Sequence, residues 1–235
     1  MTEIVVLEDP ARAAADRLAA ALIAGGQVVL TGGSTPRAAY ERLADMEVDW
    51  ASRTLWFGDE RCVPPDDERS NFGMVRASLL DRLTGTVPDV RRMLGELGPS
   101  PAADAYERDL RAAFGAGLPR FDLLLLGLGP DAHCASLFPN QPSLDERERL
   151  VVGVERPGLA PWVPRVTLTL PAINAATQVV FLVAGAEKAV AVQRAFAGKP
   201  DPSAPASLVS PTSGRLTVLL DPPAAEKLPA GAADD

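Results

Sequence analysis

Cysteine, histidine and aromatic residues are scarce in this sequence of 235 residues. It contains two cysteines, Cys62 and Cys134, one histidine, His133, and only 5% aromatic residues. Two cysteines are too few for the disulfide framework of a small secreted domain, so we expect reduced thiols and a cytoplasmic location. Because His133 and Cys134 are adjacent and face different ways, these three residues do not form a metal-ligand set, and we expect no metal site.

The sequence also has fewer basic than acidic residues and lacks long apolar runs. Lysine and arginine number 23 against 31 aspartates and glutamates, which gives a formal net charge of −8. An acidic surface repels nucleic acids and membranes, so neither is expected as a partner, whereas a small anion in a local basic pocket is compatible with it. No apolar run reaches the roughly 18 residues that span a bilayer, and the N-terminal MTEIVVLEDP lacks a signal core. The sequence therefore predicts a soluble protein.

What the chain does have is a regular alternation of short apolar runs and helical patterns. Strands are predicted at residues 4–7, 27–31, 54–58, 121–129, 151–155, 165–170, 179–185 and 216–220. Helices are predicted at 10–24, from 36 onward, and at 71–83, 102–114 and 187–198. This alternation predicts an α/β fold, a doubly wound, mainly parallel, Rossmann-like sheet with helices on both faces. Without an internal repeat or a composition break, residues 1–228 are expected to form a single domain, followed by a frayed tail over 229–235.

Polar clusters follow four of the predicted strands. In a parallel α/β sheet, ligands bind in the crevice outside the carboxyl ends of the strands, so residues directly after a strand are candidates for a site. The clusters are Gly32–Thr35, Asp59–Arg61, Asp131–His133 and Glu187–Lys188. We expect them to meet at one edge of the sheet.

The first cluster has the composition of an anion-binding turn. Two glycines let the backbone turn its amides toward a ligand, Ser34 or Thr35 can cap the following helix, and Pro36 suits a first helical turn. Exposed amides at a helix N-terminus attract phosphate. A plain capped turn fits the same residues equally well. The segment is neither a Walker loop, which needs G-K-[ST], nor a hydrolase nucleophile elbow.

Three cations and an acid are candidates for substrate binding. Arg61 could clamp a phosphate in bidentate fashion, and Asp59 could accept hydrogen bonds from sugar hydroxyls or orient a catalytic group. The alternative is a solvated turn in which Arg61 forms a surface ion pair with its acidic neighbours. Lys188 in a first helical turn opposes the helix dipole, which favours a functional explanation such as a second phosphate contact. Arg165 is a weaker candidate of the same kind.

His133 follows the four-leucine run on a loop. A neutral imidazole is the usual general base near neutral pH, although a core or capping histidine is the alternative. The GLGPDA sequence before it matches the dinucleotide-binding fingerprint, but Pro139 and Pro142 leave no room for the long helix which that motif requires. The favoured interpretation is a general base, with Asp131 as a candidate for orienting it.

Four segments carry motifs that occur together in one known family. They are VVLTGGSTPRAAY, WFGDERCVPPDDERSNFGMVRASLL, FDLLLLGLGPDAHCASLFP and RVTLTLPAINAATQVVFLVAGAEK, in order from about residue 28 to residue 188. In this combination the chain resembles the 6-phosphogluconolactonase family of the wider glucosamine-6-phosphate isomerase/deaminase-like superfamily. The resemblance implies that 6-phospho-D-glucono-1,5-lactone is hydrolysed to 6-phosphogluconate in the oxidative pentose phosphate pathway, without metal or organic cofactor.

The resemblance also implies roles for individual residues. It assigns His133 as the catalytic histidine. The family's substrate-binding residues fall on Gly33, Ser34, Thr35, Asp59, Arg61 and Lys188. The sequence departs from the family pattern at Ala132, where glycine is common, and at Cys134, where threonine is usual. Because alanine disfavours positive φ, the loop at Ala132 must either keep an ordinary backbone angle or be strained.

Two other functions remain open at this point. An amino-sugar-phosphate isomerase/deaminase of the same superfamily has a carboxylate a few positions after its histidine, whereas here no acid follows His133 before Asp145. A non-catalytic sugar-phosphate sensor would not need His133 and would be expected to carry a DNA-binding element, which the sequence lacks. The expected partner is a small phosphosugar lactone, and the expected assembly is a monomer or a weak homodimer.

Overall fold

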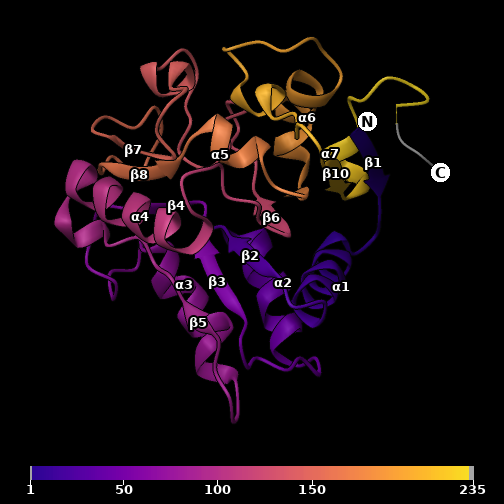
Figure 1. Ribbon diagram of the computed structural model, residues 1–235. Helices are drawn as coiled ribbons and strands as arrows, with labels where there is room; N and C mark the ends of the chain where they lie inside the picture. Colours follow the sequence, from indigo (N-terminus) through magenta and orange to yellow (C-terminus); the bar gives the residue numbers. More distant parts are fainter. Residues whose placement is uncertain (1, 233–235) are drawn as a thin grey trace.

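The run of four leucines forms the central strand of a seven-stranded sheet. The computed structural model describes residues 2–232 (Figure 1). All seven strands run parallel. Their order across the sheet is β1 (Thr2–Val6), β10 (Arg215–Leu220), β9 (Gln178–Val183), β6 (Leu123–Leu126), β2 (Gln27–Leu30), β3 (Thr54–Phe57) and β5 (Asp89–Val90). Every leucine of β6 is buried, as the prediction of a strand covered on both faces requires.

Helices cover both faces of this sheet, so the predicted fold class is confirmed. On one side, α1 (Pro10–Ile23) packs beside α2 (Ser34–Ala44), and α2 packs beside α3 (Asn71–Ser78). From β2 to β3 the chain moves toward the β5 edge of the sheet, whereas from β6 to β9 and β10 it moves toward the β1 edge. Because crossovers are right-handed, this reversal places α5 (Leu170–Asn174) and α6 (Ala189–Phe196) on the other face (Figure 1). The short α7 (Pro222–Ala225) follows β10 and packs near α6.

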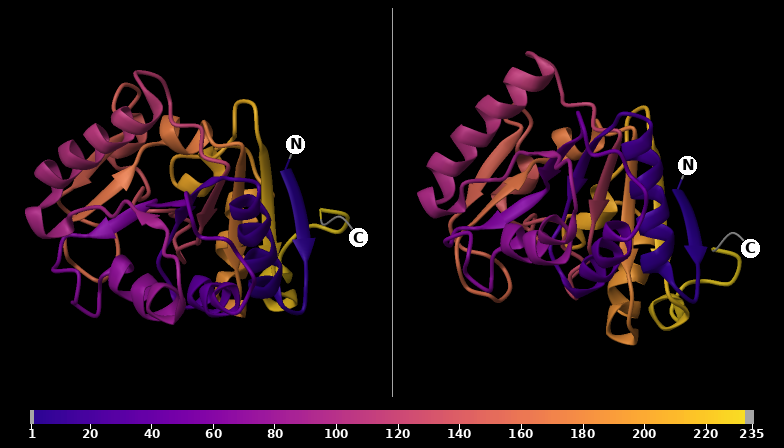
Figure 2. Two further views of the ribbon diagram at one scale, coloured as in Figure 1. Left: turned by 60° about the horizontal axis from the view of Figure 1, so that its bottom comes forward. Right: turned by 90° about the horizontal axis from the view of Figure 1, so that it is seen from below.

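Three further strands form a separate antiparallel sheet, which corrects the sequence-based prediction. β4 (Asp59–Arg61) pairs with β8 (Arg165–Leu168), and β8 pairs with β7 (Val151–Val154). Residues 151–155 and 165–170 were expected among the parallel strands. The link between them is shorter than a parallel crossover requires, so the two strands form a hairpin. The long helix α4 (Pro99–Phe114) lies against this small sheet (Figure 2).

Two other local predictions concern the helix over residues 71–83 and the C-terminal tail. The helix expected over residues 71–83 ends at Ser78, and a 3-10 turn follows at Leu80–Arg82. Its predicted cap is confirmed, because the Ser70 hydroxyl accepts a hydrogen bond from the Gly73 amide at 3.0 Å. The tail expected over 229–235 extends past the described residues, so that expectation stays a prediction.

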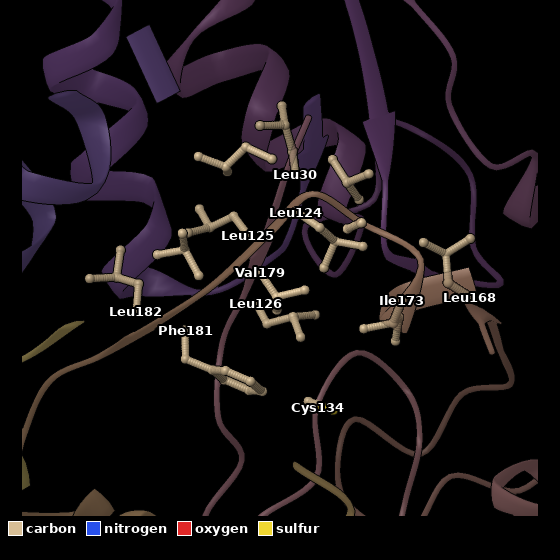
Figure 3. Close-up of a cluster of buried hydrophobic side chains, with 14 of the residues drawn as sticks. Leu30, Leu124, Leu125, Leu126, Cys134, Leu168, Ile173, Val179, Phe181 and Leu182 are labelled. Carbon is tan, nitrogen blue, oxygen red and sulfur yellow. The ribbon is translucent and has the colours of Figure 1, made fainter. Parts of the chain in front are cut away.

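The strand order creates a crevice between β2 and β6. These neighbours run parallel, but after β2 the chain continues toward β3 on one side, and after β6 it continues toward β9 on the other. The loops that follow the two strands therefore diverge, and this topological switch point is where open α/β sheets bind ligands. Behind the crevice the core is closely packed by side chains of β2, β6 and β9, which Figure 3 shows with Ile173 and Leu168.

Candidate active site

All four polar clusters meet at one cavity. It has a volume of about 360 Å³ and lies at the carboxyl ends of β2, β3, β6 and β9. Its lining includes Gly32, Gly33, Ser34, Thr35, Asp59, Arg61, His133, Arg165, Glu187 and Lys188. This volume is in the range of small-molecule sites. Of the predicted site residues, only Asp131 lies behind the lining, where it contacts His133.

The turn after β2 presents free backbone amides to the cavity. Gly33 has a φ of +115°, which only glycine adopts readily, and it stands at the N-cap of α2. The prediction that Ser34 or Thr35 caps the helix is wrong, because both lie inside it and neither side chain makes a capping bond. Within residues 2–232, the amides of Gly33, Ser34 and Thr35 donate to no protein acceptor. The helix dipole and these donors together favour an anion.

Asn71 fixes this turn against Asp59, and the sequence reasoning did not identify it. Its side-chain nitrogen donates to the backbone oxygen of Asp59 at 2.9 Å and to Asp59 Oδ1 at 3.0 Å. Its Oδ1 lies so close to Gly32 that a Cβ there would be 1.9 Å away. Ser136 Oγ donates to the other carboxylate oxygen of Asp59 at 2.6 Å. The side chain of Asp59 is thus held in place by the protein at the cavity wall, and it is buried rather than part of a solvated turn.

Glu60 on β4 has a buried carboxylate that lies at the N-terminus of α3, and the sequence reasoning also missed this residue. It accepts hydrogen bonds from the amides of Asn71 and Phe72, both at 2.7 Å, and from the Ser70 hydroxyl at 3.0 Å. Burial raises the pKa of Glu60, and the backbone hydrogen bonds only partly offset that shift. Glu60 therefore joins β4 to the helix that carries Asn71.

Two arginines lie opposite each other on adjacent strands of the small sheet. Arg61 on β4 is the register partner of Arg165 on β8, and both line the cavity. Arg165 is buried and donates to the carbonyls of Pro161 and Val163, and its pKa is lowered mainly by desolvation. Within the described residues Arg61 forms no ion pair with its acidic neighbours, contrary to the alternative considered from the sequence. Like charges opposite one another are unfavourable, so an anion between them would be stabilising.

His133 is held by Asp131 in a defined orientation. Nδ1 of the imidazole lies 2.5 Å from Asp131 Oδ1, and 18% of the histidine side chain is exposed. A carboxylate at Nδ1 favours the tautomer that carries its proton there, which leaves the lone pair on Nε2. Burial acts to raise the pKa of Asp131, but its hydrogen bonds and the charge of His133 outweigh that effect and lower it. The pair is therefore suited to general base catalysis.

Gly129 and Ala132 shape the loop around the imidazole. A Cβ at Gly129 would lie 2.0 Å from Nδ1 of His133, so only glycine leaves room for the ring. Ala132 has a φ of +67°, so of the two alternatives left open by the sequence the loop adopts the strained one. The next residue, Cys134, points into the hydrophobic cluster of Figure 3, and burial raises its pKa to about 12. Its thiol is therefore a packing group.

Lys188 approaches the same loop from β9. It ends the 3-10 turn Ala186–Lys188 that precedes α6, close to the predicted first helical turn. Its Nζ donates to the backbone oxygen of Leu128 at 2.8 Å. This bond fixes the ammonium group at the wall of the cavity, against the loop that follows β6.

Comparison with known proteins identifies the family to which the chain belongs. Residues 5–218 match the family described as glucosamine-6-phosphate isomerases/6-phosphogluconolactonase. The chain belongs to this family. It is 40% identical over 208 residues to the 6-phosphogluconolactonase of Synechocystis, with 86% of this chain and 85% of the relative covered. It is 44% identical over 177 residues to the human 6-phosphogluconolactonase, with 74% and 68% covered.

Solved structures of the same family superpose on the whole fold. The 6-phosphogluconolactonase from Trypanosoma cruzi matches with a TM-score of 0.83 and 30% identity, covering 97% of each chain. A monomeric glucosamine-6-phosphate deaminase also reaches a TM-score of 0.83, but at 19% identity, so this likeness shows the fold alone. Among residues 2–232 of this family member, no three His, Cys, Asp or Glu side chains gather as metal ligands. None of the described helices is long and apolar enough to cross a membrane.

Proposed function

We propose that the chain is a 6-phosphogluconolactonase that hydrolyses 6-phospho-D-glucono-1,5-lactone to 6-phosphogluconate, with His133 as general base. The observation that carries the proposal is that one cavity of about 360 Å³ is lined both by free amides at a helix N-terminus and by the chain's single imidazole. An anion cradle and a base in one cavity fit a substrate with a phosphate at one end and an ester at the other. The names of the relatives support this substrate.

The phosphate is held by the amides of Gly33, Ser34 and Thr35. Arg61 and Lys188 also line the cavity and add positive charge, and Arg165, beside Arg61 on the adjacent strand, contributes to the same field. The protein as a whole has a net charge of −8, so this local concentration of cations and amides is what attracts an anionic substrate. Held at the phosphate, the lactone has its C1 carbonyl directed toward the loop after β6.

The ester is cleaved by water that His133 activates. Nε2 removes a proton from the water as its oxygen bonds to C1, and the imidazolium that forms is stabilised by Asp131 at Nδ1. When the tetrahedral intermediate collapses, the bond from C1 to the ring oxygen breaks. The leaving ring oxygen takes the proton back from Nε2. Each turnover thus returns the imidazole to its neutral state. Positioned acid–base catalysis of this kind contributes about 10²- to 10⁴-fold.

The test is turnover of freshly prepared lactone by the wild type and by His133→Ala. We expect kcat to fall by about 10²- to 10⁴-fold, with KM changing little, because the phosphate contacts remain. Wild-type turnover in the histidine variant would remove His133 from the mechanism. Binding of 6-phosphogluconate without any turnover in the wild type would instead support a sensor. Release of ammonia from glucosamine 6-phosphate would support the deaminase.

A further inference from the structure

The loop that carries His133 depends on support from outside the cavity. Ala132 is fully buried with a φ of +67°, in the left-handed region that alanine disfavours. Within the loop, the Gly129 amide donates to the His133 carbonyl at 2.9 Å, and the Ala132 amide donates to the Gly129 carbonyl at 3.0 Å. A strained backbone of this kind persists only where neighbouring structure holds it.

That support comes from Arg194 on α6 and from residues 201–207. The Ala206 amide donates to the Ala132 carbonyl at 3.0 Å. One terminal nitrogen of Arg194 donates to the Asp131 carbonyl at 3.3 Å, and the other donates to the carbonyl and the hydroxyl of Ser203. Arg194 thus bridges the peptide of Asp131 and residues 201–207. It is exposed and is not part of the cavity lining.

Residues 201–207 are a suitable anchor because they bond closely to one another. The Asp201 carboxylate accepts hydrogen bonds from the Ser203 amide at 2.8 Å and from the Ser203 hydroxyl at 2.6 Å. The Ser207 hydroxyl accepts from the Asp201 amide at 2.8 Å. The positive charge of Arg194 also adds to the lowering of the pKa of Asp201, after the hydrogen bonds from Ser203. The guanidinium therefore connects the catalytic loop to a fixed turn.

We propose that Arg194 is a positioning residue that acts through the Asp131 carbonyl to hold the Asp131 carboxylate against Nδ1 of His133. Arg194 does not line the cavity, and its hydrogen bonds within the described residues go to Asp131 and Ser203, not to the imidazole. The inference rests on the proposed function, in which His133 is the base. A guanidinium can bond Asp131 and Ser203 at the same time because its nitrogens form a rigid fork, whereas a lysine ammonium is a single point charge.

The first test is a kinetic double-mutant cycle. Arg194→Ala is expected to lower kcat by about tenfold, an effect smaller than the roughly 10²-fold cost of a displacement of about 1 Å, because one of several supports of the loop is lost; KM should stay nearly unchanged, since the phosphate contacts remain. In an Asp131→Asn background the same substitution should have no further effect, since the group on which it acts has been changed. Arg194→Lys should behave like the alanine variant, and it serves as the test protein if Arg194→Ala folds poorly.

The matched control is Arg111→Ala. Arg111 is also an exposed helical arginine, and one of its terminal nitrogens donates to the Ala116 carbonyl at 3.3 Å, the same distance as in the bond from Arg194 to Asp131. It does not line the cavity. Unchanged kcat in Arg111→Ala with a loss in Arg194→Ala supports the proposal. A loss that persists undiminished in the Asp131→Asn background overturns it, because Arg194 would then act by another route.

The second test does not depend on activity. His133 is the only histidine, so the imidazole signals in a nitrogen-15 NMR spectrum come from one residue. The low-field proton on Nδ1 that is bonded to Asp131 should be present in the wild type and in Arg111→Ala, and it should move upfield or broaden in Arg194→Ala. An unchanged signal together with unchanged kcat refutes the positioning role. A wild type without lactonase turnover refutes the proposed function instead, while the NMR result still decides the role of Arg194.

Discussion

Replacing Gly129 by alanine tests the position of the imidazole more directly than removing the histidine does. The added Cβ would lie 2.0 Å from Nδ1 and 2.1 Å from Cε1 of His133, and 2.8 Å from Oδ1 of Asp131. Ordinary contact begins at about 3.4 Å, so the ring must retreat by about 1.4 Å to restore it. The backbone of Gly129 does not have a positive φ, so the main conflict is with these two side chains.

The expected loss follows from that displacement. A misplacement of about 1 Å costs about 10²-fold in rate, which corresponds to about 2.7 kcal/mol of transition-state stabilisation. The floor is the activity of His133→Ala, about 10²- to 10⁴-fold below the wild type. We therefore expect kcat of Gly129→Ala to fall at least 10²-fold, close to the level of the histidine variant, with a much smaller change in KM because the phosphate contacts are untouched.

Steady-state kinetics on fresh lactone measure the effect, and Gly58→Ala is the control. A Cβ at Gly58, at the same edge of the sheet, would meet its nearest neighbour at 3.6 Å, which is ordinary contact. Its kcat should stay close to that of the wild type. If Gly129→Ala turned over lactone at the wild-type rate with its thermal unfolding unchanged, the observed place of the His133 ring would not be the one used in catalysis.

Three further predictions concern binding, capping and pH. Lys188→Ala should raise KM with little change in kcat, since its charge acts on the phosphate; initial rates over a range of lactone concentrations measure this, and a fall in kcat alone would contradict the role. Ser70→Ala should lower the free energy of unfolding in urea by about 1 kcal/mol, because the cap of α3 is lost; no change in the midpoint would refute the capping role. The pKa of Glu60 is raised above its ordinary 4.5, so the stability contributed by its protonated form is complete below that pH and is lost as the pH rises through the folded value. Unfolding free energies measured from pH 4.5 to neutral should therefore fall more steeply in the wild type than in Glu60→Gln, and parallel curves would exclude Glu60 as the titrating group.

Which residues hold each polar side chain in place became visible only in the folded structure. Asp59 is a candidate from the sequence for binding sugar hydroxyls or orienting the catalytic group; in the structure it lines the cavity, and its carboxylate is held by Ser136 and Asn71. Ser136 lies 77 positions from Asp59. No local pattern reports a contact across such a separation. Glu60 looks like part of a charged turn in the sequence for the same reason, because the loop between β4 and α3 separates it from the helix amides that it binds.

The fold class and the sheet edge at which the polar clusters meet are both readable from the sequence alone. Alternating apolar runs and helical patterns have a local physical cause, because burial on both faces of a parallel strand demands a short continuous apolar run such as the leucines of β6. Strand order, the separate small sheet and the facing pair Arg61 and Arg165 depended on packing between distant segments. The orientation of the His133 imidazole also depends on tertiary structure. Its hydrogen bond with Asp131 joins residues that are close in sequence, but the geometry of that bond depends on the space at Gly129 and on the support from residues 201–207.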